Sequence, residues 1–202
     1  MFLIAEPNNQ TVEEFLERQR NAPFSYMEIG ATRDSAAPRD YTIDHNRVQI
    51  GTGCDCFKRA TRAVRSWKMF DLTWTKIRRA NTPIETGETV AILINHFGFW
   101  SLNAARIVYV FEESVAIEKY GFAYGTLVEH GERGEERFSV EYHEADQTVW
   151  YDLYAFSQPN NFWAKIGYPF SRYLQKQFAI ESKEAMRRAV LKRSSSIIRR
   201  NK

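Results

Sequence analysis

Cysteine is scarce in this 202-residue chain, which holds only Cys54 and Cys56. A single residue separates the two, so they offer no disulfide framework of the kind that small secreted domains use. They could ligate a metal, but a structural zinc site takes four ligands, and the sequence holds no second cysteine cluster. We therefore expect neither a disulfide-stabilised fold nor a metal site.

The motifs of several enzyme classes are also missing. The four histidines, at positions 45, 96, 130 and 143, show no HxH or HxxxH spacing, and no Gly-x-Ser-x-Gly nucleophile motif occurs. Gly51-Thr52-Gly53 lacks the third glycine of a dinucleotide fingerprint, because Cys56 stands there. We expect a tight strand-to-helix turn at these glycines and no cofactor.

Long apolar runs are absent as well. The start, Met1 to Glu6, is too short for a signal-peptide core and has no preceding positive charge. No stretch approaches the roughly 18 uninterrupted apolar residues that a membrane-spanning helix needs. These features predict a cytoplasmic protein.

Charge is modest overall, at +3, but unevenly placed. Residues 181–202 carry eight Lys or Arg against two Glu, whereas the rest of the chain is mildly acidic. A local basic end of this kind makes nucleic acid an improbable partner for the chain as a whole. The residues that could contact an anionic membrane surface are Arg187, Arg188, Lys192 and Arg193, and the alternative is a solvated helix end.

The composition, with 44% hydrophobic and 14% aromatic residues, suffices for one core. Residues 1–40 look like a separate lead-in, with a short helix over about 11–20 capped by Thr11. From Tyr41 the pattern is that of a strand to Ile50, the glycine turn, and an amphipathic helix over 54–68. Six strands are then expected at 71–79, 88–96, 99–112, 117–129, 135–143 and 148–157.

The last part of the chain is helical in pattern. Asn160 or Asn161 can cap a short helical turn, and the main helix is expected to start near Pro169. Six consecutive strands with short links predict an antiparallel meander, and burial of its apolar face is simplest if the sheet curls around this helix. The fold class is therefore α+β, with about seven strands.

Aromatic residues gather toward the end of the chain. Ten of the 29 residues from Trp150 to Phe178 are aromatic, and they could fill a core or line a pocket. In the strand at 148–157, Trp150, Tyr154 and Phe156 alternate with Val149, Tyr151, Leu153 and Ala155, which indicates that both faces are covered.

Several motifs occur in an order that resembles a known family. They are Asp44-His45-Asn46-Arg47 before Ile50-Gly51-Thr52-Gly53, then Gly121 to Leu127, Gly134 to Phe138, Trp150-Tyr151-Asp152, Ala155 to Pro159, and Gly167-Tyr168-Pro169 with Gln175 and Phe178. Over about residues 41–190 the chain is similar to the DUF1990 (UPF0548) family of the START-like, or Bet v 1-like (SRPBCC), superfamily. The resemblance implies a helix-grip fold and a superfamily of apolar-ligand binders, but it carries over no catalytic residue.

With this resemblance the chain divides into the lead-in 1–40, a START-like domain over 41–192 and a flexible basic tail over 193–202. Our first interpretation is a noncatalytic module that binds a small apolar or amphipathic molecule in an internal pocket. The residues expected to contact it are Arg106, Tyr109, Tyr124, Thr126, Trp150 and Phe170.

Two other interpretations stay open. An enzyme of cyclase or hydrolase type would use a carboxylate and a histidine, for which Glu136 and His130 are the candidates. A membrane-surface or interaction module would use the basic helix end instead. Arg106, in an apolar strand, needs a partner in any case, which could be an ion-pair carboxylate such as Glu136 or an anionic ligand head.

Overall fold

The computed structural model describes residues 1–35, 38–78, 83–115, 117–160 and 168–191. The elements along the chain are β1 (Phe2–Leu3), α1 (Asn9–Gln19), β2 (Thr42–Thr52), α2 (Cys54–Arg65), η1 (Lys68–Phe70), β3 (Thr75–Arg78), β4 (Thr89–His96), β5 (Phe99–Ser114), β6 (Glu118–Thr126), β7 (Glu132–His143), β8 (Thr148–Pro159) and α4 (Tyr168–Leu191). The described strands form one eight-stranded antiparallel sheet.

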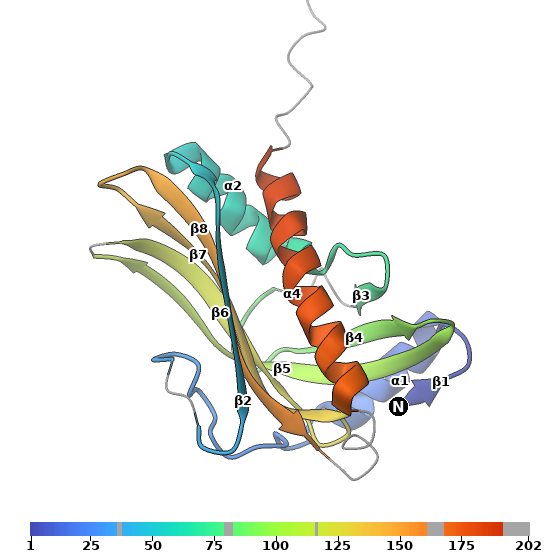
Figure 1. The fold of residues 1–202 in the computed structure, drawn as a ribbon. Helices are drawn as coiled ribbons and strands as arrows, with labels where there is room; N and C mark the ends of the chain where they lie inside the picture. The colour runs from blue at the N-terminus through green and yellow to red at the C-terminus, as the bar shows by residue number, and fades with distance from the viewer. Residues whose placement is uncertain (36–37, 79–82, 116, 161–167, 192–202) are drawn as a thin grey trace, which may run out of the picture.

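The strand order in this sheet is β2-β8-β7-β6-β5-β4-β3, with β1 paired to β5. Strands β3 to β8 are therefore sequential neighbours, and β2 joins the end of the series through β8. Figure 1 shows the sheet bending around α4, which crosses its concave side, while α1 lies beside β4 and β5. The predicted α+β helix-grip arrangement is confirmed.

We call the face toward α2 and α4 the inner face. Its apolar side chains pack against both helices: the ring centroids of Tyr142 and Phe57 of α2 are 6.0 Å apart, and those of Phe138 and Phe178 of α4 are 6.4 Å apart. Phe122 and Phe138 are fully buried. The main core of the protein therefore lies between the inner face and the two helices.

The opposite, outer face carries a second, smaller core. The apolar side of α1 packs there, with Val12, Phe15 and Leu16 against Leu93 and Leu102. Side chains along β8 alternate between the two faces as predicted. Tyr151 on the inner face donates or accepts a 2.8 Å hydrogen bond with Ser182 of α4, while Phe156 on the outer face stacks edge-on against Tyr26.

The strand-to-helix turn has the expected conformation. Gly53 begins α2 with a φ of +84°, which favours glycine, and a Cβ at Gly51 would lie 2.5 Å from the sulfur of Cys56. Cys56 is buried and Cys54 is exposed. Close packing and backbone conformation thus account for the glycines that resemble a phosphate loop.

Several predicted boundaries were wrong. The N-cap of α1 is Asn8, whose side chain accepts from the Thr11 backbone N–H, rather than Thr11. Helix α2 ends near Arg65 because Trp67 adopts a left-handed conformation at φ 55°. The strand expected at 71–79 covers only Thr75–Arg78, and β1 was not predicted. The helical turn expected after Asn160 or Asn161 lies largely outside the described residues.

Candidate functional site

A row of four side chains crosses the inner face below the first half of α4. In successive strands, Tyr124 of β6 lies opposite Glu136 of β7, which lies opposite Ala155 of β8, which lies opposite Asp44 of β2. Because directly opposite residues in an antiparallel sheet point to the same side, two carboxylates and a phenol share this row.

Tyr124 and Glu136 are in direct contact. The phenol of Tyr124 donates a 2.5 Å hydrogen bond to Oε2 of Glu136. Burial raises the pKa of Glu136 to about 7, the Tyr124 hydrogen bond opposes that shift, and the nearby charges of Asp44 and Glu132 add to it. Glu136 is thus a carboxyl group that exchanges its proton near neutral pH.

Polar contacts join the first half of α4 to the sheet. Arg172 forms a two-pronged ion pair with Asp44. Its Nη1 donates to Oδ2 of Asp44 at 2.5 Å, and its Nη2 donates to Oδ1 at 2.8 Å. Gln175 accepts from Arg172 and donates to Glu132 and, at 3.1 Å, to Ser157. Burial raises the pKa of Glu132, against hydrogen bonds that favour its ionised form.

Burial differs between the two halves of α4. Its buried residues are Ala179, Ser182, Ala185, Met186 and Val190, and all of them lie after residue 178. No residue from 168 to 178 is buried. On the inner face, Asp44, Glu132, Glu136, Ala155 and Ser157 all remain partly exposed. Apolar packing therefore closes the fold only beneath the second half of α4.

Aromatic rings border this partly exposed region. The Phe70 ring lies 4.9 Å from Phe178 of α4 and 6.3 Å from Tyr124, measured between centroids. The ring centroids of Trp74 and Phe178 are 6.5 Å apart. The indole N–H of Trp74 donates a hydrogen bond to the carboxylate of Glu181. Phe70 thus lies beside Tyr124, and Phe178 and Trp74 continue this group of rings away from the Tyr124–Glu136 pair.

His130 does not contact Glu136 in any described interaction. Its Nδ1 accepts a 3.0 Å hydrogen bond from the backbone N–H of Glu132, and burial lowers its pKa to about 4. His130 is therefore neutral at physiological pH and serves the turn between β6 and β7. The carboxylate–histidine pair proposed for an enzyme is not assembled by the described contacts.

Arg106 lies on the outer face, at the end of α1. Its guanidinium donates to the main-chain carbonyls of Gln19, Arg20 and Ala22 at 2.8–2.9 Å, and its Nε donates to Thr89. Carbonyls at a helix C-terminus carry partial negative charge, so a cation is favourable there. The C-terminal end of α1 is therefore the partner of the Arg106 guanidinium. The ion pair with Glu136 that the sequence suggested does not form, because Glu136 lies on the inner face.

The other residues expected at the ligand are scattered. On the outer face, the Tyr109 hydroxyl bonds Thr32, and Arg47 lies 4.2 Å above the Trp150 ring. Thr126 hydrogen-bonds Gly134 and Ser25. Phe170, in the first turn of α4, is 42% exposed and approaches Phe97. Of the six, only Tyr124 lies beside Glu136.

Glu135 is next to Glu136 in sequence but lies on the outer face, where it binds the lead-in segment through hydrogen bonds. This buried carboxylate accepts from the Tyr26 hydroxyl and the Gly30 N–H at 2.7 Å, from the Thr32 N–H at 3.1 Å, and from the Thr32 hydroxyl. The hydrogen bonds satisfy its charge without a cation. Residues 26–32 are therefore packed against the sheet.

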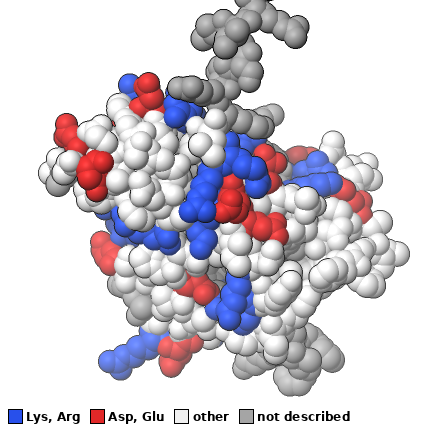
Figure 2. Space-filling model, turned by 45° about the horizontal axis from the view of Figure 1, so that its top comes forward, with Lys and Arg blue, Asp and Glu red and all other residues white. Residues whose placement is uncertain are grey.

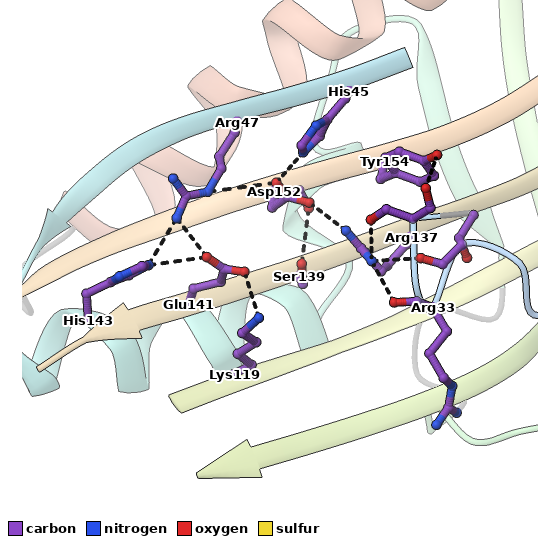
Figure 3. A network of polar contacts seen from close by, with 12 residues as sticks. Arg33, His45, Arg47, Lys119, Arg137, Ser139, Glu141, His143, Asp152 and Tyr154 are labelled. Atoms are coloured by element: carbon purple, nitrogen blue, oxygen red, sulfur yellow. Dashed lines mark hydrogen bonds and ion pairs between the residues drawn. The ribbon is translucent and has the colours of Figure 1, made fainter. Parts of the chain in front are cut away.

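A larger polar network covers the outer face of β2, β7 and β8 (Figure 3). Asp152, 4% exposed, accepts from Arg137 at 3.0 Å and contacts His45 at 2.7 Å. Glu141 accepts from Arg47 at 2.7 Å and lies 3.4 Å from Lys119. Each carboxylate in this network has a cationic neighbour, so we interpret the network as one that stabilises the fold.

Two surface hollows accompany these features. One, of about 530 Å³, is lined by Arg65, Ile84, Glu112 and Tyr120 among others; the second, of about 340 Å³, lies between the lead-in and Arg133 and Gln158. Both are open to solvent, and Glu136 lines neither of them. Arg65 in the first is paired with Glu112 at 3.1 Å.

The basic helix end is described only in part. Arg187 pairs with Glu184 at 2.7 Å, and Arg188 lies in the last turn of α4, whereas Lys192 and Arg193 fall outside the described residues. Figure 2 shows positive and negative side chains interspersed over the face it presents, separated by broad uncharged areas.

No helix among the described residues is long and apolar enough to cross a membrane. Within the same residues, no group of three or more His, Cys, Asp or Glu side chains could hold a metal ion.

Sequence reasoning missed Asp44, Glu132, Arg172 and Gln175 as members of this site. Two signals were present. Asp44 alternates with Ile43 and His45 along β2, so it takes the inner face when they take the outer one. Gln175 belongs to a family motif, but its partners come from β7 and β8 and could not be inferred without the fold.

Comparison with known proteins places the chain among relatives of similar length. Residues 25–185 match the family described as "Domain of unknown function (DUF1990)", beginning inside the predicted lead-in. A UPF0548 protein of Dictyostelium discoideum is 36% identical over 208 residues, covering 94% of this chain and 96% of the relative. One from Deinococcus radiodurans is 37% identical over 185 residues, covering 87% and 88%. The resemblance deduced from the motifs is confirmed.

Among solved structures, the crystal structure of Ara h 8.0201 aligns with 76% of this chain and 99% of its own, at 11% identity and a TM-score of 0.49.

Proposed function

Since the chain belongs to the DUF1990 family, whose function is unknown, we propose from its geometry that it binds a small amphipathic molecule between the first half of α4 and the inner face. The observation that carries the proposal is the contrast within α4. Its second half buries small and apolar residues against the sheet, whereas residues 168–178 bury none.

The sheet beneath this first half is incompletely covered. Ala155 is a small inner-face residue of β8, the strand next to the edge strand β2, and it stays partly exposed between Glu136 and Asp44. An inner-face alanine in a closed core would be fully buried, as Ala105 is on β5. The exposure of Ala155 supports a space that a ligand can occupy.

The chemistry around Ala155 suits an amphipathic ligand. The rings of Phe70 and Phe178 provide an apolar side, and Glu136, Tyr124 and Gln175 provide a few polar groups. Ligand sites are typically apolar with a small number of orienting polar groups. The site as a whole therefore favours a molecule with one polar end and one apolar body.

A dye titration tests the proposal. We expect the neutral, apolar dye Nile red to bind saturably with a rise in fluorescence. In Ala155→Trp, whose new indole fills the proposed space, we expect an affinity loss of about tenfold or more. Gln49→Trp, on the exposed outer side of the edge strand β2, is the matched control and should bind the dye like the wild type.

Equal dye binding by wild type and Ala155→Trp, with both proteins folded by circular dichroism, would exclude this space as the site. Native mass spectrometry of protein purified from its own host would then identify any molecule that co-purifies with the wild type but not with Ala155→Trp.

A further inference from the structure

The charges that face the proposed space are unevenly compensated. Asp44 of β2 has its own cation in Arg172 of α4, and Glu132 of β7 accepts from Gln175. Glu136 of β7 has only the uncharged Tyr124 of β6 as a hydrogen-bond partner among the described residues. Tyr151 of β8 also faces this side, but it bonds Ser182.

Arg172 is not available to Glu136. Its two terminal nitrogens are engaged by both oxygens of Asp44, and one of them also donates to Gln175. The carboxylates of Asp44 and Glu132 meanwhile repel a negative charge on Glu136. Glu132 accepts from the uncharged Gln175 but is also stabilised by the charge of Arg172, whereas Glu136 has no cationic neighbour among the described residues.

An isolated carboxylate in a poorly solvated position gains from a cation that enters with a ligand. Ammonium groups also interact favourably with aromatic faces, and the rings of Tyr124 and Phe70 lie beside this position, with Phe178 next to Phe70. An anionic head group would meet repulsion from Glu136, Glu132 and Asp44, and a neutral one would leave the charge of Glu136 unmatched.

We propose that the ligand is an amphipathic amine, whose ammonium group binds the carboxylate of Glu136 while its apolar body lies against Phe70 and Phe178. This inference rests on the proposed function, because it names the chemical class for the same space. In this proposal Glu136 recognises the positive charge of the ligand, and the rings of Phe70 and Phe178 recognise its apolar body.

Three matched probes separate charge from apolar contact: octylamine, octan-1-ol and octanoate, each titrated by isothermal calorimetry. At pH 8 we expect octylammonium to bind at least about tenfold more tightly than octanol, and octanoate to bind most weakly. Between pH 6 and pH 8 the affinity for octylammonium should rise as Glu136 ionises, because an alkylamine stays protonated throughout this range.

Two variants assign the effect to Glu136. Glu136→Gln should weaken octylammonium binding about tenfold and abolish its rise with pH, while leaving octanol unaffected. Glu141→Gln removes a charge from the same strand but on the outer face, so its octylammonium affinity should stay within about twofold of the wild type.

The outcomes distinguish the two proposals. Equal affinity for the three probes, or an unchanged affinity in Glu136→Gln, would overturn the amine inference and leave the binding space intact. Octylammonium binding that survives Ala155→Trp would also overturn it, because the amine would then bind elsewhere. If Nile red also fails to bind the wild type, the proposed function falls with it.

Discussion

Replacing Glu136 by glutamine should make the protein more stable, and the gain should depend on pH. The pKa of Glu136 is about 7 in the folded protein, against an ordinary value of 4.5. A carboxyl group whose pKa is raised on folding holds its proton more tightly in the native state. The contribution of Glu136 to the free energy of unfolding is therefore fully present below pH 4.5 and is lost as the pH rises through 7.

The size of this effect follows from the shift. One pKa unit corresponds to about 1.4 kcal/mol, so ionised Glu136 costs the folded state about 3 kcal/mol at pH 8. Glutamine carries no charge, and its amide oxygen can still accept from Tyr124. We expect Glu136→Gln to gain about 3 kcal/mol over the wild type at pH 8 and almost nothing near pH 4.5.

Urea denaturation at half-unit steps from pH 4.5 to pH 8.5 measures the difference directly. Glu141→Gln is the control of opposite sign, because Arg47 and Lys119 help to keep the pKa of Glu141 below its ordinary value. That variant should be less stable than the wild type by a nearly constant amount over the upper part of this pH range, because the stabilisation from ionised Glu141 is fully present above its ordinary pKa of 4.5 and is lost only at lower pH. A gain in Glu136→Gln that is the same at every pH, or a loss at pH 8, would refute the reasoning.

Two further substitutions test the outer face of β7. Glu135→Ala removes the acceptor of Tyr26, Gly30 and Thr32 and should cost about 3–5 kcal/mol in denaturant titration, where exposed Glu144→Ala should change little. Gly134→Ala should cost about 3 kcal/mol or more, because φ is +153° and the new Cβ would lie 2.0 Å from the Phe156 carbonyl oxygen. Gly131→Ala, whose Cβ meets open space, is its control, and equal stability of the two alanine variants would contradict the packing argument.

The regular parts of the fold were predictable because side-chain alternation is a local property. Phe138 and Val140 alternate with Ser139 and Glu141 in the sequence, and the structure places the first pair on the inner face and the second on the outer face. Hydrophobic periodicity thus specifies the inner face of a strand without reference to its neighbours.

Arg106 and Tyr109 show where that local rule fails. Residues three apart on a regular strand point to opposite faces, yet both side chains lie on the outer face. The pairing of β5 with β6 shifts register between Ile107 and Tyr109, and such a bulge restores the two residues to one side. Nothing in the local sequence marks this extra residue.

The candidate site was predictable only as far as Tyr124 and Glu136. These two are opposite neighbours on adjacent strands, so a correct hairpin brings them together. Arg172 lies 128 positions from Asp44, and its pairing depends on how the helix crosses the sheet. Long-range contacts of this kind are a property of the assembled fold.

The uneven burial of α4 also bears on how quickly its backbone amides exchange with solvent. Amides in the second half, over Met186 and Val190, should be protected close to the limit set by global unfolding, because releasing them opens the main core. Those in the first two turns are held through polar contacts of Tyr168, Arg172 and Gln175 and without a buried apolar side chain, so a local opening can expose them at lower free energy. The helix therefore combines a firmly anchored end with an end that can lift while the rest of the protein stays folded, and a molecule could enter at the lifted end.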